Sequence, residues 1–169
     1  ELGYLTAVEP DDADAAVGRT LAGDHDIEER MMLRIEVRRA DGTPVIVDHA
    51  LNEVVVSRTA ASQTVRLGVS LDGEFLTSYA ADGLIAATPT GSTAYAFSAR
   101  GPIVDPVHRA IQLTPVSPHM LFDRTMVLDP STEVSMVVLG QREATCSVDG
   151  RELVVLGEGD SVVCMVSDR

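Results

Sequence analysis

The sequence contains no lysine and no tryptophan, and aromatic residues make up only 4% of it. Its core must therefore be built from aliphatic side chains, mainly Val, Leu, Ile and Ala. Hydrophobic residues account for 45% of the chain, which excludes a disordered tail. A length of 169 residues favours one domain that can bury a core of its own.

Cysteine is also scarce, since Cys146 and Cys164 are the only two. Two cysteines in a chain of this length exclude a disulfide framework and a zinc knuckle, and they favour a reducing, cytoplasmic setting. No apolar run is long enough to span a bilayer, and no secretory signal pattern is visible. The chain begins at Glu1 rather than Met and stops directly after a strand-like run, so we expect both ends to be cut from a longer polypeptide.

Positive charge is sparse as well. The chain has 26 Asp and Glu against 13 cations, all of them Arg, which gives a net charge of −13. Such a field repels nucleic acids and anionic membranes, so we expect neither as a partner. A nucleotide can still bind where backbone N–H groups converge at the start of a helix.

Most of the chain has the alternation that is typical of strands. Residues 2–8 predict a short strand, and residues 13–22 predict a helix that Asp11 or Asp12 caps and Gly23 ends. Short strand-like segments then follow, several of them separated by Asp-Gly turns. They read MLRIEVRR, PVIVDHALNEVVVSR, VRLGVSL, EFLTSYA, VSMVVLG, TCSV, RELVVL and SVVCMVS. This pattern predicts a mainly β, antiparallel sandwich-like fold, with residues 114–119 as a Pro-rich connection.

One segment, residues 82–98, breaks this rhythm. GLIAATP predicts a strand, and GSTAYAFSAR has helical spacing that places Ala94, Phe97 and Ser98 on one face. The loop between them, TPTGSTAY, combines a fixed proline with a permissive glycine, Gly91. It also offers hydroxyl groups at the helix start, from Thr90, Ser92 and Thr93.

Two interpretations of this loop stay open on its chemistry alone. The hydroxyls suit an ordinary capped helix. The same N–H groups also suit a phosphate, ribose or base edge, with Tyr95 available to stack on an adenine. The loop is neither a Walker A sequence nor G-x-G-x-x-G.

The segment DGLIAATPTGSTAYAFSA resembles the signature of the NAD kinases. Leu51–Val55, LNEVV, is similar to a second element of that family, and LGYL and TPVSPHMLFDRTMVL resemble its flanking segments. The resemblance covers nearly the whole chain. It implies that residues 1–169 form the C-terminal, NAD-binding and oligomerisation domain of an NAD kinase.

The resemblance also implies roles for individual residues. Asn52 and Glu53 would hold ribose hydroxyls, and Asp82 would contact NAD at a base or amide across a subunit interface. The dinucleotide pocket would further be lined by Thr90, Thr93, Ala94, Tyr95 and Ser98. Taken singly, Asn52 and Glu53 also fit ordinary strand positions, Asp82 fits a turn, and Ser98 fits a packing position.

The activity implied is phosphorylation of the adenosine 2′-hydroxyl of NAD by ATP, or by polyphosphate, to give NADP. Mg²⁺ or another divalent cation would accompany ATP, and the enzyme would be a homodimer or homotetramer. The catalytic base is expected in a Gly-Gly-Asp-Gly-Thr motif of an N-terminal α/β domain that this chain lacks. We therefore expect no catalytic residue here, no convincing ATP cradle and no activity of this chain alone.

Some residues depart from the family pattern or stand outside it. Arg100 replaces a common glycine, which puts the end of the helix in doubt, and Ala80 replaces a common basic residue. Asp149 is most simply a hairpin residue, with a lesser chance of a site role. The four histidines show no paired ligand spacing, so no metal site is expected; they are His25, His49, His108 and His119.

Two other functions remain as alternatives. One is a non-catalytic nucleotide-binding or oligomerisation module. The other is a lipid kinase domain related to the diacylglycerol kinases, which share a distant architecture with NAD kinases. The choice of ligand separates these functions, because only the NAD kinase interpretation requires the dinucleotide.

Overall fold

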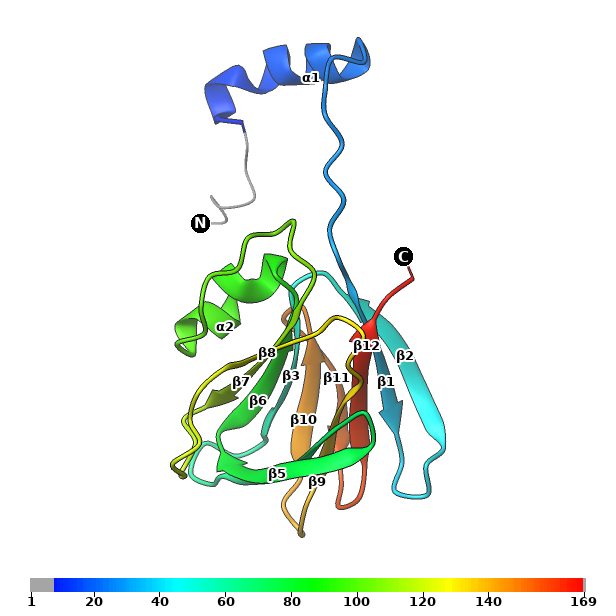
Figure 1. Ribbon diagram of the computed structural model, residues 1–169, viewed down its shortest axis with the longest axis vertical. Coiled ribbons are helices and arrows are strands. Elements are labelled where there is room, and N and C mark those ends of the chain that lie inside the picture. The colour runs from blue at the N-terminus through cyan, green and yellow to red at the C-terminus, as the bar shows by residue number, and fades with distance from the viewer. Residues whose placement is uncertain (1–7, 169) are drawn as a thin grey trace.

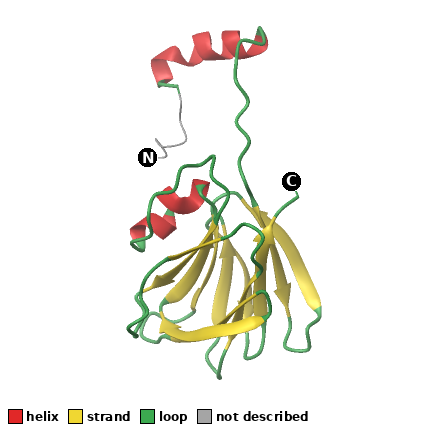
Figure 2. Ribbon diagram, in the orientation of Figure 1, coloured by secondary structure: helices red, strands yellow, loops and turns green. Residues whose placement is uncertain are grey.

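The computed structural model describes residues 8–168 and shows two antiparallel sheets packed face to face (Figures 1 and 2). The first sheet has the order β2-β1-β12-β9-β4-β5. Its strands are β1 (Leu33–Arg38), β2 (Pro44–Ala50), β4 (Val65–Leu71), β5 (Glu74–Ala81), β9 (Val134–Val138) and β12 (Ser161–Val166).

The second sheet has the order β11-β10-β3-β6-β7-β8. Its strands are β3 (Glu53–Arg58), β6 (Gly83–Ala87), β7 (Ile111–Val116), β8 (Met126–Leu128), β10 (Ala144–Val148) and β11 (Arg151–Leu156). The predicted mainly β, antiparallel sandwich is therefore confirmed.

The core between the sheets is aliphatic, as the composition requires. In β1, the side chains of Leu33, Ile35 and Val37 are fully buried because alternate residues of a strand point to the same face. Cys146 and Cys164 lie in this core as free thiols. Burial raises the pKa of the Cys146 thiol to about 12, and it also raises the pKa of Cys164, so both remain protonated at neutral pH.

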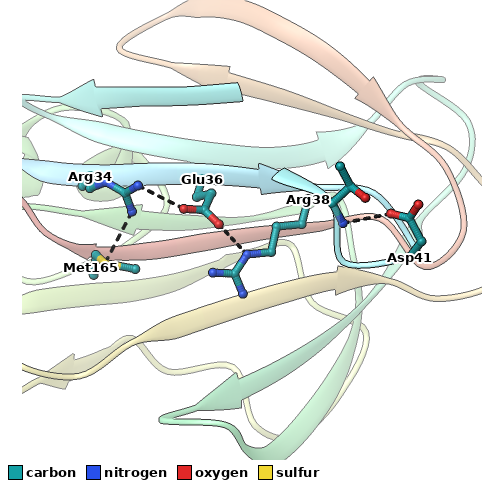
Figure 3. A network of polar contacts seen from close by, with 6 residues as sticks. Arg34, Glu36, Arg38, Asp41 and Met165 are labelled. Atoms are coloured by element: carbon teal, nitrogen blue, oxygen red, sulfur yellow. Dashed lines mark hydrogen bonds and ion pairs between the residues drawn. The ribbon is translucent and has the colours of Figure 1, made fainter. Parts of the chain in front are cut away.

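The outer face of β1 carries a short ladder of charges, which Figure 3 shows. Glu36 accepts hydrogen bonds from Arg34 at 3.0 Å and from Arg38 at 2.6 Å. Arg34 also contacts the sulfur atom of Met165 on the neighbouring β12. The bond from Arg38, supported by Arg34, lowers the pKa of Glu36 below its ordinary value although burial opposes the shift.

Two of the predicted Asp-Gly turns connect hairpins with the expected left-handed backbone. Asp72 and Gly73 have φ of 50° and 82° between β4 and β5. Asp149 and Gly150 have φ of 45° and 77° between β10 and β11. These values are typical of a type I′ turn, whose twist matches that of the strands it joins.

Two predictions about strands need correction. The segment 44–58 was expected to continue as one strand pattern, but it forms β2 in the first sheet and β3 in the second, with a corner at Leu51–Asn52. Residues 114–116 were expected in a connection, but they belong to β7. Pro115 is tolerated there because β8 pairs only with Ile111–Leu113, so no strand flanks Pro115 on that side.

The helix predicted over residues 13–22 is present as α1 (Ala13–Leu21), after a 3₁₀ turn at Pro10–Asp12. The chain leaves it at Gly23, whose φ is 79°. Asp12 precedes the helix but makes no capping hydrogen bond with its side chain, contrary to expectation. The strand predicted over residues 2–8 lies outside the described residues, apart from Val8.

None of the α1 residues is buried, and Figure 1 shows this helix away from the sandwich, at the end of an extended segment. Within residues 8–168, no helix has the length and apolar character needed to cross a membrane.

The Glu36 ladder yields a prediction about stability. Glu36→Gln should lower the free energy of unfolding by about 1 kcal/mol at pH 7, because partly exposed ionic hydrogen bonds are worth roughly that much. Since folding lowers the pKa of Glu36, this stabilisation is present above about pH 4.5 and is lost as the pH falls further. Urea unfolding at several pH values measures the difference.

Glu152→Gln is the matched control, because Glu152 is an exposed strand residue with no ion pair among the described residues. It should leave stability unchanged at every pH. An equal effect of the two substitutions would contradict a specific contribution of the ladder.

Candidate functional site

The site begins at the corner where β2 ends and β3 starts. The Asp149 carboxylate accepts hydrogen bonds there from the backbone N–H groups of Leu51 (2.8 Å), Asn52 (2.9 Å) and Glu53 (3.0 Å). The backbone N–H of Asp149 in turn donates to the carbonyl oxygen of Glu53 at 3.0 Å. Asp149, predicted mainly as a turn residue, therefore also fixes the backbone of the predicted Asn52–Glu53 pair.

The TPTGSTAY loop packs directly on this corner. The backbone N–H of Thr88 donates to the carbonyl oxygen of Asn52 at 2.9 Å. The Thr88 hydroxyl donates to the carbonyl oxygen of Leu51 at 2.5 Å. The Thr88 hydroxyl also accepts from the N–H of Gly91 at 3.0 Å. A Cβ atom on residue 91 would lie 2.0 Å from the Asn52 carbonyl oxygen, so this close approach requires glycine.

The helix after the loop is shorter than predicted. Thr90–Thr93 forms a 3₁₀ turn, η2, and Tyr95–Ser98 forms the short helix α2. They are separated at Ala94, whose φ of −95° and ψ of −128° are not helical. This break rotates α2, so Ala96 is the buried residue, and the predicted packing face of Ala94, Phe97 and Ser98 is wrong.

The hydroxyls of Thr90, Ser92 and Thr93 do not cap these helices, contrary to the capped-helix interpretation. Neither η2 nor α2 has a capping hydrogen bond from a side chain. The Ser92 hydroxyl instead bonds to both the N–H and the carbonyl of Val104, at 3.0 and 3.2 Å. The Thr93 hydroxyl donates to the carbonyl oxygen of Thr90 at 3.4 Å.

Glu53 is the most unusual polar group of the site. Its side chain is buried, with 7% of the residue exposed, and its Oε2 atom has no hydrogen-bond partner. Burial, reinforced by the charge of Asp149, raises its pKa to about 7, although the N–H of Tyr95 donates to the carboxylate and opposes the shift. A buried carboxylate oxygen without a partner is costly, and a ligand hydroxyl would satisfy it.

An arginine that the sequence did not single out also reaches the loop. Arg30 precedes β1, and its guanidinium donates to the Thr90 hydroxyl at 3.3 Å while forming an ion pair with Glu28 at 2.6 Å. It is 60 positions from Thr90 in the chain, and no local pattern indicates their contact.

Asp82 lies at the other end of the same strands. The pairing of β3 with β6 joins Glu53 to Ala87 and Ser57 to Gly83, so four strand steps of about 3.3 Å separate the two ends. Asp82 forms an ion pair with Arg58 at 2.8 Å. One chain therefore does not bring Asp82 together with Asn52 and Glu53.

Tyr95 and Ser98 also border a cleft of about 470 Å³, which we call the arginine cleft. The other residues of this cleft that concern its chemistry are Arg100, Ser117, Asp123, Arg124 and Thr125. The sequence indicated Arg100 only as a departure from the family pattern, and it gave no indication of a role for Arg124.

The fold and this geometry define an antiparallel β-sandwich domain with a polar site at one end of β3 and β6. Residues 51–169 match the family described as the ATP-NAD kinase C-terminal domain. The chain belongs to that family.

Curated relatives agree with the family. The chain is 41% identical over 169 residues to the NAD kinase of Koribacter versatilis, covering 99% of this chain and 59% of that protein. It is 38% identical over 164 residues to the NAD kinase of Carboxydothermus hydrogenoformans, covering 96% and 58% respectively. The chain thus spans somewhat more than half the length of these relatives.

Two solved structures share the fold. A yeast NADH kinase complexed with NADH superposes with a TM-score of 0.90 at 31% identity, over 96% of this chain and 48% of that one. An NAD kinase from Archaeoglobus fulgidus in complex with ATP gives a TM-score of 0.80 at 24% identity, over 99% and 62%. The second likeness supports the fold alone.

The buried carboxylate of Glu53 makes stability depend on pH. Because folding raises its pKa from about 4.5 to about 7, the folded state holds the proton more tightly than the unfolded state. The free energy of unfolding therefore falls as the pH rises through this interval, by about 3 kcal/mol from this group, and does not change further above it.

Glu53→Gln removes the contribution of this carboxyl to the pH dependence of stability. The stability of the variant minus that of the unsubstituted protein should increase by about 3 kcal/mol between pH 4.5 and pH 8. Denaturant unfolding at both pH values measures this change, in which the other titrating groups cancel. A difference that does not vary with pH would show that Glu53 titrates normally.

Proposed function

We propose that this chain supplies the NAD-binding half of an NAD kinase, which transfers a phosphoryl group from ATP to the adenosine 2′-hydroxyl of NAD. The observation that carries the proposal is the unpartnered Oε2 atom of the buried Glu53, beside the loop that packs on Asn52. Relatives named NAD kinase and the likeness to a yeast NADH kinase complexed with NADH support the choice of ligand.

In this proposal the ribose lies against the corner of β2 and β3. Glu53 accepts a hydrogen bond from a ribose hydroxyl through Oε2, while the Tyr95 N–H keeps the carboxylate oriented. The Asn52 side chain has no hydrogen bond among the described residues, so its amide is free to donate and accept. Tyr95 is 44% exposed and offers its ring for stacking on the adenine.

The remaining predicted residues are proposed to surround the ligand rather than to react. They are Thr90, Thr93, Ala94 and Ser98, which follow one another along η2 and α2. None has a side chain that could exchange protons at neutral pH, so their contribution is shape and hydrogen bonding.

Asp82 is proposed to complete the site of a neighbouring subunit. Its distance from Glu53 along β6 excludes a contact with the same ribose in one chain. A homodimer or homotetramer that places Asp82 near the dinucleotide of a second copy would give it the role that the family resemblance implies.

Phosphoryl transfer itself is proposed to need residues beyond this chain. The general base is expected in a Gly-Gly-Asp-Gly-Thr motif on an N-terminal α/β domain, and ATP or polyphosphate would be the donor, with Mg²⁺ accompanying ATP. Within residues 8–168, no three His, Cys, Asp or Glu side chains gather as metal ligands, so the described part of the chain does not fit a Mg²⁺ site. We derive no step through the metal and expect no activity from this chain alone.

Calorimetric titration of NAD into the full-length protein tests the site. Asn52→Ala should weaken binding about tenfold, because it removes hydrogen bonds to the ribose. Tyr95→Ala should weaken it by tenfold or more, because stacking on a base is worth about 1–3 kcal/mol. Phe97→Ala is the matched control, since Phe97 lies on the same short helix and is 54% exposed.

The control should bind NAD with unchanged affinity. Equal losses from Phe97→Ala and Tyr95→Ala would contradict the proposed site, and a protein that assembles but binds no dinucleotide would favour a structural module.

A coupled enzymatic assay for NADP tests whether residues 1–169 are active without the rest of the protein. Formation of NADP by residues 1–169 alone, at a rate near that of the full-length protein, would refute the expectation of inactivity.

A further inference from the structure

The arginine cleft is lined by more positive than negative side chains. Arg100 and Arg124 border it, and Asp123 is the only acidic residue in its lining. Asp123 faces Arg124 at 3.4 Å, in a pair whose arginine is 89% exposed. The Arg100 guanidinium makes no hydrogen bond or ion pair with residues 8–168. In a chain of net charge −13, this cleft is therefore locally cationic.

The backbone holds Arg100 in an unfavourable conformation. The N–H groups of Arg100 and Gly101 donate to the carbonyls of Phe97 and Ala96, at 2.9 and 2.8 Å, and so close α2 with a Schellman motif. Its central position, residue 100, has a φ of 70°. Glycine is preferred there because a Cβ atom disfavours left-handed φ.

Ser117, across the cleft, has a φ of 46°. Within residues 8–168, four residues other than glycine have a positive φ, and the other two, Asp72 and Asp149, begin type I′ turns that favour it. The remaining two, Arg100 in its Schellman motif and Ser117, border the same cleft. Unfavourable backbone conformations of this kind concentrate at ligand sites.

Tyr95 joins this cleft to the proposed ribose site. Its N–H donates to the Glu53 carboxylate, and its side chain borders the arginine cleft. Ser98 follows it on α2, and its hydroxyl is a further donor at the border. A ligand held at Glu53 and stacked on Tyr95 can therefore extend into the cleft.

We propose that the arginine cleft binds the pyrophosphate of the dinucleotide, with Arg100 and Arg124 as its cationic contacts. This inference rests on the proposed function and adds two residues to it. Guanidinium groups suit the pyrophosphate because their planar donors match phosphate oxygens and keep their charge at any physiological pH. Ser117 adds a neutral hydroxyl to the lining of the cleft, whereas the Thr125 hydroxyl already shares a hydrogen bond of 3.1 Å with the Thr114 hydroxyl.

The test compares NAD with adenosine, which lacks the pyrophosphate, by calorimetry on the full-length protein. Arg100→Gly should weaken NAD binding about tenfold, the loss of one charge-assisted contact, and should leave adenosine binding unchanged. It should also raise the melting temperature by about 3 °C, since glycine relieves the left-handed position, so poor folding cannot explain the loss. Arg100→Lys, which keeps the charge, should recover part of the affinity.

Arg109→Gly is the matched control for net charge, because Arg109 is exposed and outside the cleft. It should change NAD affinity less than about twofold, and the salt dependence of NAD binding should weaken only in the Arg100 variant. Unchanged NAD affinity in Arg100→Gly, or equal losses for NAD and adenosine, would overturn this inference alone. Failure of the unsubstituted protein to bind either ligand would overturn the proposed function and this inference together.

Discussion

The carboxylate of Asp149 accepts three consecutive backbone N–H groups at the corner where the chain passes from the first sheet to the second. Such a crossing leaves donors that no strand can satisfy, and a buried donor without a partner costs about as much as a lost hydrogen bond. Asp149 satisfies them from a type I′ turn whose own geometry is fixed by β10 and β11. The backbone donors of the corner are therefore satisfied.

The other parts of the site follow from this corner. The carbonyls of Leu51 and Asn52 are held where Thr88 can bond to both, and Gly91 can then approach the Asn52 backbone closely. The same carboxylate acts electrostatically, because its charge adds to burial in raising the pKa of Glu53. One aspartate therefore sets the shape of the site and favours a neutral Glu53 until a hydroxyl donor stabilises its charge.

The sequence predicted those features that depend on neighbouring residues. Strand alternation and the Asp-Gly turns give most of the strands and both type I′ hairpins, because pleat and turn twist are local properties. The break at Ala94 was missed because helical spacing in GSTAYAFSAR does not report how the loop packs on Asn52. The contact between Arg30 and Thr90, and the passage of residues 44–58 between sheets, depend on tertiary structure and have no local signal.

The arrangement also explains how so acidic a chain could bind an anionic ligand. Charge repulsion acts over the whole surface, but it is screened beyond about 8 Å in physiological salt, so nearby groups decide the affinity. The proposed ligand meets a protonatable carboxylate at Glu53 and the guanidinium groups of Arg100 and Arg124 in the arginine cleft. The site and the rest of the surface can therefore differ in sign.

Backbone amide hydrogen exchange of the full-length protein, with and without saturating NAD, tests the central claim most directly. If NAD binds at the corner that Asp149 holds, exchange should slow in residues 51–53 and 88–98, because ligand contacts suppress local opening there. The hairpin at Asp72–Gly73 should exchange at the same rate in both states. Protection confined to other segments, or none in these two, would contradict the account.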